Sequence, residues 1–128
     1  MKTKQFLLIL LACLCFPFAQ LWSNPVNGLL ERIDPGASKK FIIQVKKGQS
    51  DFFELDQKGD KVVIRGNNYV NIATGLNWYL KYYAGIHLSW NGMTAKLPES
   101  LPKVSTPVRK ETNLSLRYDF NYCTYSYT

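Results

Sequence analysis

The 128-residue sequence is long enough for one domain with a modest hydrophobic core. Hydrophobic residues make up 46% of the chain, a fraction that excludes intrinsic disorder. The formal net charge of +7 comes from cations scattered along the sequence, so we expect solvated surface charges and no nucleic-acid partner.

Residues 1–19 are expected to be an export signal. A short positive segment precedes an apolar run, 6–16, that is too short to cross a bilayer as a helix. Cleavage after Ala19 would release a soluble protein. Alternatively, residues 10–13 resemble a bacterial lipobox, which would leave Cys13 as a lipidated N-terminus. Either route takes the mature protein out of the cytoplasm, to the periplasm, the outer surface or the medium.

A short helix and three strands are expected next. Pro25 suits the first turn of the helix, which ends before the turn at 34–36. Apolar alternation predicts a strand at 41–45. Two further strands, at 52–56 and 61–65, flank a loop at 57–60 and are expected to form a hairpin.

The longest unambiguous element is a helix over residues 68–85. Asn67 or Asn68 can cap its start, and Gly85 lies where a helix commonly ends. A glycine in mid-helix, Gly75, is expected to mark close packing against a sheet. Apolar side chains at spacings of three and four place one face against that sheet: Tyr69, Ala73, Leu76, Leu80 and Tyr83.

The order of elements predicts an α+β fold, a small antiparallel or mixed sheet with helices on one face, in a domain over 24–97. Asn91-Gly92 between two apolar runs predicts a hairpin of strands 86–90 and 93–97. Residues 98–113 are rich in proline and are expected to be an extended connector, not a core element. A new strand from Leu114 would begin a second domain, of which 114–128 is the start.

The templates for catalytic and metal sites fail. His87 is the only histidine and has no neighbouring ligands in sequence, so no metal site is expected, and no phosphate-binding glycine loop indicates a cofactor. Cys123 is the only cysteine outside the signal region and reads as a small buried hydrophobe. A nucleophilic pair of His87 and Cys123 would have to form across the connector, with no orienting third residue. The carboxylates read as solvated charges, and no catalytic residue is expected.

Three stretches together carry a family resemblance: Asn27–Arg32, Gly75–Gly92 and Arg117–Thr128. In this order they resemble the N-terminal region of α-N-acetylglucosaminidases, glycoside hydrolase family 89. Asp119 departs from the family pattern without shifting its neighbours.

The resemblance implies a small non-catalytic α+β domain before a (β/α)8 barrel that removes terminal α-linked N-acetylglucosamine from glycans of glycosaminoglycan or mucin type. It implies a retaining mechanism with two glutamates. Both would lie downstream, so this chain would hold only the first barrel strand.

The resemblance also implies the residues that would contact substrate. Asn121, Cys123 and Tyr127 match family positions in the sugar pocket at the end of the first barrel strand, the edge where such barrels place their active sites. An asparagine amide can bond two sugar hydroxyls, and a tyrosine adds an apolar face with a polar tip. The implied partners are the downstream barrel of the same polypeptide and the glycan.

The rival interpretation is a free-standing glycan-binding module that stacks sugars on Trp78, Trp90 and the tyrosines. That interpretation predicts exposed aromatic side chains. The enzyme-domain interpretation predicts four side chains of the long helix buried against the sheet: Tyr69, Leu76, Tyr79 and Tyr83.

Overall fold

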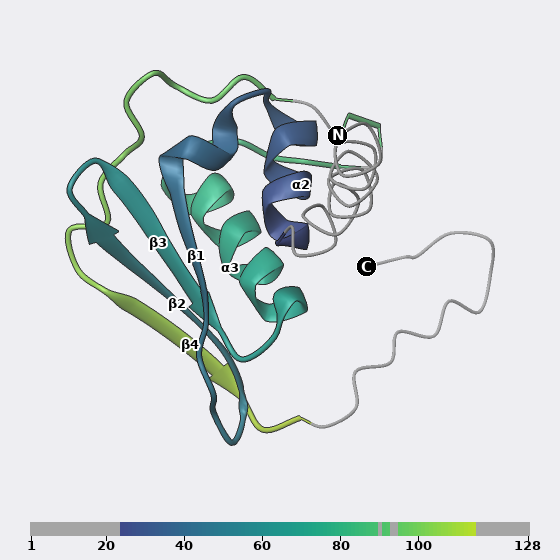
Figure 1. Ribbon diagram of the computed structural model, residues 1–128, viewed down its shortest axis with the longest axis vertical. Coiled ribbons are helices and arrows are strands. Elements are labelled where there is room, and N and C mark those ends of the chain that lie inside the picture. Colours follow the sequence, from purple (N-terminus) through teal and green to yellow (C-terminus); the bar gives the residue numbers. More distant parts are fainter. Residues whose placement is uncertain (1–23, 90, 93–94, 115–128) are drawn as a thin grey trace, which may run out of the picture.

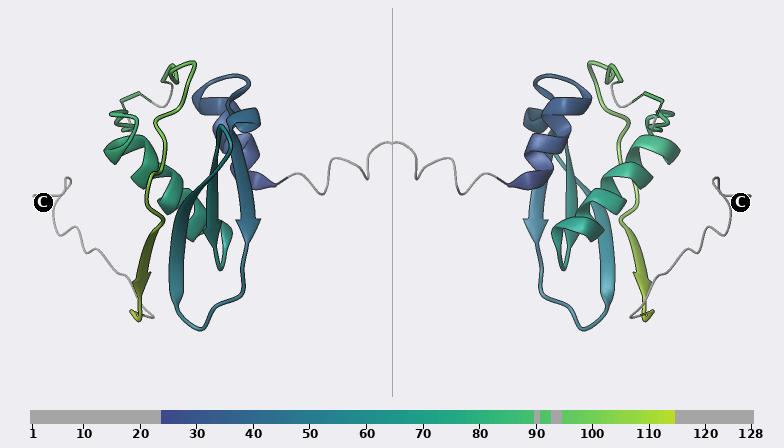
Figure 2. Two further views of the ribbon diagram at one scale, coloured as in Figure 1. Left: turned by 90° about the vertical axis from the view of Figure 1, so that its left-hand side faces the viewer. Right: turned by 90° about the vertical axis from the view of Figure 1, so that its right-hand side faces the viewer.

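A four-stranded mixed sheet and two helices form two layers, with both helices on one face of the sheet (Figures 1 and 2). The structure, a computed structural model, describes residues 24–89, 91–92 and 95–114. The elements, in chain order, are α2 (Pro25–Ile33), a short 3-10 helix (Ala37–Lys40), β1 (Phe41–Val45), β2 (Asp51–Lys58), β3 (Lys61–Gly66), α3 (Tyr69–Tyr82) and β4 (Val108–Thr112).

The strand order is β1-β3-β2-β4. β1 runs parallel to β3, whereas β2 is antiparallel to both β3 and β4. The hairpin of β2 and β3 is confirmed. Its strands run longer than predicted because Gly59, with a φ of 60°, allows a tight turn after Lys58. The sheet is therefore mixed, one of the two arrangements that the sequence predicted.

α3 confirms the predicted central helix. The Asn68 side chain caps it by accepting a hydrogen bond from the Asn71 N–H at 2.8 Å. Gly75 lies against the sheet, as expected. Of the four side chains expected to be buried, Leu76 and Tyr79 are; Tyr83 is partly buried, and Tyr69 is 45% exposed, so that prediction was wrong for Tyr69.

α2 also forms as predicted. The Asn24 side chain caps it through the Val26 N–H at 2.9 Å, and its inner face, with Val26, Leu30 and Ile33, is buried in the core shared with α3. Within the described ranges neither helix has the length and apolar character needed to cross a membrane.

The hairpin predicted around Asn91-Gly92 is wrong as far as the structure describes it. Ser89 and Gly92 make a single isolated bridge, and the described residues on either side belong to no strand. The chain is instead held to the end of α2. The Ala95 N–H donates to the Ile33 carbonyl at 3.0 Å, and the Leu97 N–H donates to Asp34 Oδ2 at 2.9 Å.

Residues 98–113 contribute to the core and to the sheet, whereas the sequence predicted only an extended connector. The part up to 107 contains no helix or strand, but Leu101 and Val104 are buried in the core. The part after it is β4, which pairs with β2 and extends the sheet. The expected export segment at 1–19 and the rest of the expected barrel strand beyond Leu114 lie outside the described residues.

Candidate functional site

The residues predicted to contact sugar, Asn121, Cys123 and Tyr127, all lie outside the described residues, as does Trp90. His87 is exposed in the loop after α3, and its proposed partner Cys123 cannot be placed. Within the described ranges no three or more His, Cys, Asp or Glu side chains gather as metal ligands would. The candidate sites in the described part of the domain include its two faces, the cavity between β4 and α3, and a pocket of about 350 Å³ lined by Gln49, Ser50, Asp51, Thr112, Asn113 and Leu114.

The helix-free face of the sheet hides apolar side chains under charged ones. Phe52 and Val63 point to this face, yet each is only 2% exposed. The Arg109 guanidinium lies over the Phe52 ring, 3.9 Å from its centroid. The loop before β2 also packs against the ring, since a Cβ on Gly48 would come within 2.5 Å of it.

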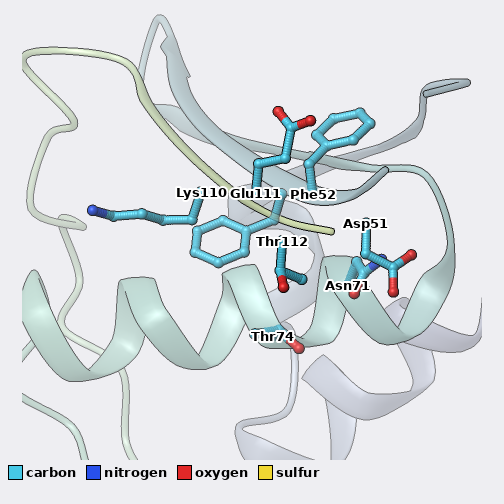
Figure 3. A pocket seen from close by; sticks show the side chains of 8 residues that line it. Asp51, Phe52, Asn71, Thr74, Lys110, Glu111 and Thr112 are labelled. Atoms are coloured by element: carbon cyan, nitrogen blue, oxygen red, sulfur yellow. The ribbon is translucent and has the colours of Figure 1, made fainter. Parts of the chain in front are cut away.

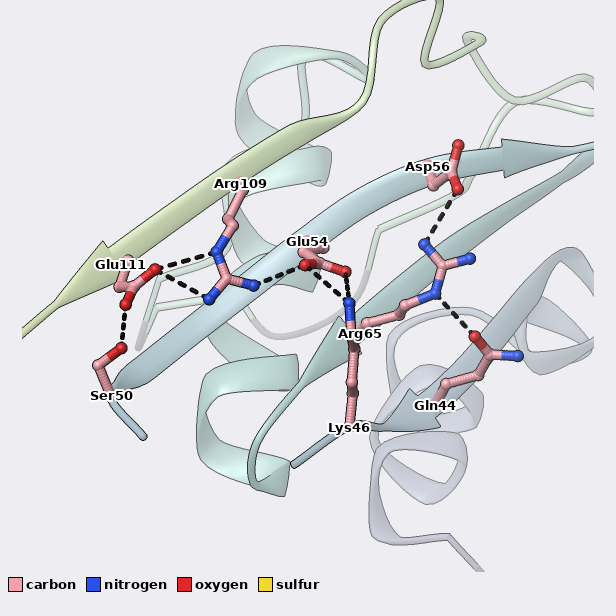
Figure 4. A network of polar contacts seen from close by, with 8 residues as sticks. All are labelled: Gln44, Lys46, Ser50, Glu54, Asp56, Arg65, Arg109 and Glu111. Carbon is pink, nitrogen blue, oxygen red and sulfur yellow. Dashed lines mark hydrogen bonds and ion pairs between the residues drawn. The ribbon is translucent and has the colours of Figure 1, made fainter. Parts of the chain in front are cut away.

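A chain of ion pairs runs across this face (Figure 4). Glu54 accepts hydrogen bonds from Arg109 at 2.6 Å and from Lys46 at 3.3 Å, and Arg109 continues to Glu111 at 2.8 Å. Arg65 bridges Asp56 at 3.0 Å and Gln44 at 2.8 Å. The sequence does not predict this network, because these side chains become neighbours only through the register of the strands.

The carboxylates of this face are held ionised. Partial burial alone would raise the pKa of Glu54, but hydrogen bonds from Arg109 and Lys46 outweigh it and hold that pKa below the ordinary 4.5. A hydrogen bond from the Gln57 N–H and the pairing with Arg65 lower the pKa of Asp56, and bonds from Ser50 and Arg109 lower that of Glu111. Each of these hydrogen bonds favours the charged form of the carboxyl group that accepts it.

A small cavity of about 140 Å³ lies on the opposite face, between β4, the start of β2 and α3 (Figure 3). Asn71, which is 5% exposed, points into it, and its Nδ2 donates to Asn67 Oδ1 at 2.6 Å. Asp51 accepts a further bond from Asn67 Nδ2 at 3.0 Å. The volume is below the roughly 300 Å³ typical of ligand pockets, so the cavity is too small to hold a whole sugar.

Three aromatic side chains form a cluster of tilted rings beside this cavity. Trp78 lies between Phe53 and Tyr82, with ring centroids 5.8 and 4.5 Å away, and Lys110 Nζ is 5.3 Å from its ring. Trp78 is partly buried and Tyr82 is 58% exposed. Trp78 and Tyr82 are two of the described residues of the rival sugar platform, together with Tyr69, Tyr79 and Tyr83.

Comparison with known proteins gives a consistent result. The family described as the alpha-N-acetylglucosaminidase (NAGLU) N-terminal domain matches residues 24–103. Human alpha-N-acetylglucosaminidase is 33% identical over 110 residues, which is 80% of this chain and 15% of the human protein.

Solved structures agree with the sequence matches. The family 89 glycoside hydrolase of Clostridium perfringens, in complex with 2-acetamido-1,2-dideoxynojirmycin, is 38% identical with a TM-score of 0.71, over 82% of this chain and 12% of that one. The same clostridial enzyme in complex with its substrate GlcNAc-alpha-1,4-galactose is 37% identical, with a TM-score of 0.70 and the same coverage. The chain thus spans only 12–15% of the length of these relatives. Because the family match covers most of the chain and agrees with the fold, this chain belongs to the family of alpha-N-acetylglucosaminidase N-terminal domains.

Proposed function

We propose that this chain is the N-terminal, non-catalytic domain of an exported, exo-acting α-N-acetylglucosaminidase. The enzyme would remove terminal α-linked N-acetylglucosamine from glycans of glycosaminoglycan or mucin type. The observation that carries the proposal is the family match over residues 24–103, together with a fold that superposes on a family 89 enzyme at a TM-score of 0.71. The clostridial relative's substrate, GlcNAc-alpha-1,4-galactose, supports the choice of sugar and linkage.

The carboxyl groups of the described residues support the non-catalytic role. Hydrogen bonds hold the pKa values of Glu31, Glu54, Asp56 and Glu111 below the ordinary range, whereas one of two catalytic carboxyls must stay protonated near neutral pH. The proposed catalytic pair would belong to a downstream (β/α)8 barrel, with this domain packed against it.

Within that complete enzyme we assign a substrate-binding role to three residues outside the described ranges. Asn121, Cys123 and Tyr127 would line the sugar pocket, with Asn121 and Tyr127 bonding sugar hydroxyls and Cys123 filling space beside them. The export route, by cleavage after Ala19 or by lipidation at Cys13, belongs to the same proposal.

The alternative is a free-standing carbohydrate-binding module. The exposed ring of Tyr82, 4.5 Å from the Trp78 ring centroid, is the observation in its favour. Against it, Trp78 is partly buried, packed between Phe53 and Tyr82 with Lys110 over its ring, so it offers less free surface than a sugar-stacking platform needs.

The deciding experiment isolates the native protein with an antibody raised against this domain, then measures its intact mass and its hydrolysis of a chromogenic α-N-acetylglucosaminide. The proposal expects a polypeptide several times longer than 128 residues, with activity on the α-linked but not the β-linked sugar. A native protein that binds N-acetylglucosamine glycans without hydrolysing them would favour the module and overturn the proposal.

A further inference from the structure

The outward face of α3 lacks the charges that a water-facing helix surface normally carries. This face consists of Val70, Thr74, Asn77 and Lys81, at spacings of four, three and four, and all four are exposed. Lys81 is the only charged residue among the helix's 14. Helices at a solvent boundary usually place several charged side chains on their outer face.

Three exposed side chains of α3 are large and apolar. Val70 is 71% exposed, and Tyr69 and Tyr82, which flank the outward face, are 45% and 58% exposed. Two of the polar groups present are turned back onto the helix: the Thr74 hydroxyl donates to the Val70 carbonyl at 3.0 Å, and Lys81 lies 5.3 Å from the Tyr82 ring centroid. A helix surface with exposed apolar side chains and a single charge is suited to contact with another protein surface.

The opposite side of the domain is built differently. There the apolar side chains Phe52 and Val63 are covered, and ion pairs from Glu54 and Asp56 span the strands above them. Figure 2 shows that the helices lie on the other side of the sheet. Charged side chains thus cover the helix-free face of the sheet, as suits contact with water. The outward face of α3 has no such cover.

The position of the chain beyond β4 indicates what covers this face. Thr112, the last residue of β4, lines the same cavity as Asn71 and Thr74 of α3 (Figure 3). Leu114 follows two residues later and is 68% exposed. Polypeptide that continues past Leu114 therefore starts beside α3, and the relatives that match this chain are far longer, since it spans only 12–15% of their length.

We infer that the outward face of α3 is the surface on which the domain that follows this one in the same polypeptide docks. This inference rests on the proposed function, which supplies the following domain, and it adds the surface that receives it. Because the contact is made within one polypeptide, it forms without the loss of translational freedom that a separate partner would incur.

The test uses the full-length protein and compares two exposed valines. Val70 lies on the outward face of α3, and Val45, which is 55% exposed, ends the edge strand β1. Val70→Cys and Val45→Cys variants are labelled with a maleimide, and the rate at each site is read by peptide mass spectrometry. By its exposure in the domain alone, the thiol introduced at position 70 should react at least as fast as the thiol at the control site. Docking predicts a rate about tenfold or more slower at position 70, since interface cores exclude solvent.

A second pair guards against a variant that misfolds. Asn77→Cys lies further along the same face of α3, and Ser105→Cys lies at an exposed site in the segment before β4. Equal labelling rates in both pairs would overturn the inference. Protection that disappears on dilution would assign the face to a second copy of the protein, and protection that appears only with added glycan would assign it to sugar; either result overturns it as well.

Hydrolysis measured on the same preparations separates this inference from the proposed function. Activity on an α-N-acetylglucosaminide together with free labelling at position 70 would leave the proposed function standing and remove the docking surface. Protection at position 70 without activity would retain the docking surface and remove the assigned reaction. A native polypeptide with no further domain would overturn both.

Discussion

Gly75 of α3 lies directly against Phe53 of β2. A Cβ built on Gly75 would be 3.1 Å from the Phe53 Cβ and 3.0 Å from Cγ2 of Ile64 on β3. The Phe53 Cβ is fixed by the backbone, and Cγ2 of Ile64 could move only by a change of χ1 in a fully buried, β-branched side chain. The absence of a side chain at this position sets how closely the helix approaches the sheet.

Gly75→Ala should therefore destabilise the domain even though alanine favours helices. The gain in helix propensity is about 1 kcal/mol, and overpacking a tight core contact costs about 1–3 kcal/mol. We expect a net loss of about 1 kcal/mol in the free energy of unfolding, measured by urea denaturation. Asn77→Ala, at an exposed position of the same helix, is the matched control and should be neutral or slightly stabilising. A stabilised Gly75→Ala would show that the two layers can separate freely.

Tyr79 links α3 to residues 98–113, which the sequence predicts to be a connector. Its ring is fully buried, and its hydroxyl donates to the Pro102 carbonyl at 2.7 Å. Tyr79→Phe leaves that carbonyl without its partner and should lower the free energy of unfolding by about 1–2 kcal/mol. Tyr82→Phe, which alters an exposed ring on the same helix, should change it by less than about 0.5 kcal/mol. Equal effects of the two variants would argue against the bond.

The same hydroxyl predicts how stability changes in alkali. Burial, with a smaller contribution from Tyr83, raises the pKa of Tyr79 from 10.0 to about 12. Above pH 10 the unfolded chain loses this proton while the folded chain keeps it, so stability falls as the pH rises towards about 12. Tyr79→Phe lacks this proton, and the wild-type advantage over it should shrink across that window. Urea denaturation of both proteins at a series of alkaline pH values measures the difference.

Glu54 predicts the opposite dependence in acid. Its pKa is held below 4.5 in the folded state by Arg109 and Lys46, which outweigh the effect of partial burial. The stabilisation is present above the ordinary pKa and is lost as the pH falls through the lower folded value. Glu54→Gln should therefore be less stable than wild type at neutral pH, with a gap that closes in acid. Glu99→Gln, at an exposed site, is the control. A gap that stays constant with pH would mean that the carboxylate charge contributes nothing.

Signals within a few residues of sequence correctly predicted α2, α3 and β1. Pro25 at the start of α2, the Asn68 cap, the helical periodicity of α3 and the alternation in β1 each act within a few residues, and each element formed. β4 was missed because its Val-Arg-Lys-Glu-Thr sequence has little apolar alternation. It is an edge strand, and its pairing with β2 comes from a contact with residues far away in the sequence.

The hairpin around Asn91-Gly92 failed for a related reason. The turn signal was sound, since Ser89 and Gly92 do bridge, but a turn does not decide what its flanks pair with. Leu88, Ala95 and Leu97, which the predicted hairpin would have paired, pack against the hydrophobic core instead. The ion-pair face was equally hidden, because Arg109 and Glu54 become neighbours only when β4 takes its register. The candidate sugar contacts rest on family resemblance alone.

Asn121 gives the sharpest test of those contacts. In the full-length enzyme, Asn121→Ala removes a side chain that we propose bonds sugar hydroxyls, which leaves those hydroxyls without that partner. Losing one such bond costs about 1–3 kcal/mol, so kcat/KM on an α-N-acetylglucosaminide should fall about 10- to 100-fold. Ser126→Ala, in the same stretch but outside the matched positions, should leave kcat/KM within about threefold of wild type. Unchanged kinetics for Asn121→Ala in a protein with wild-type stability would remove Asn121 from the pocket, and with it the register that assigns Cys123 and Tyr127.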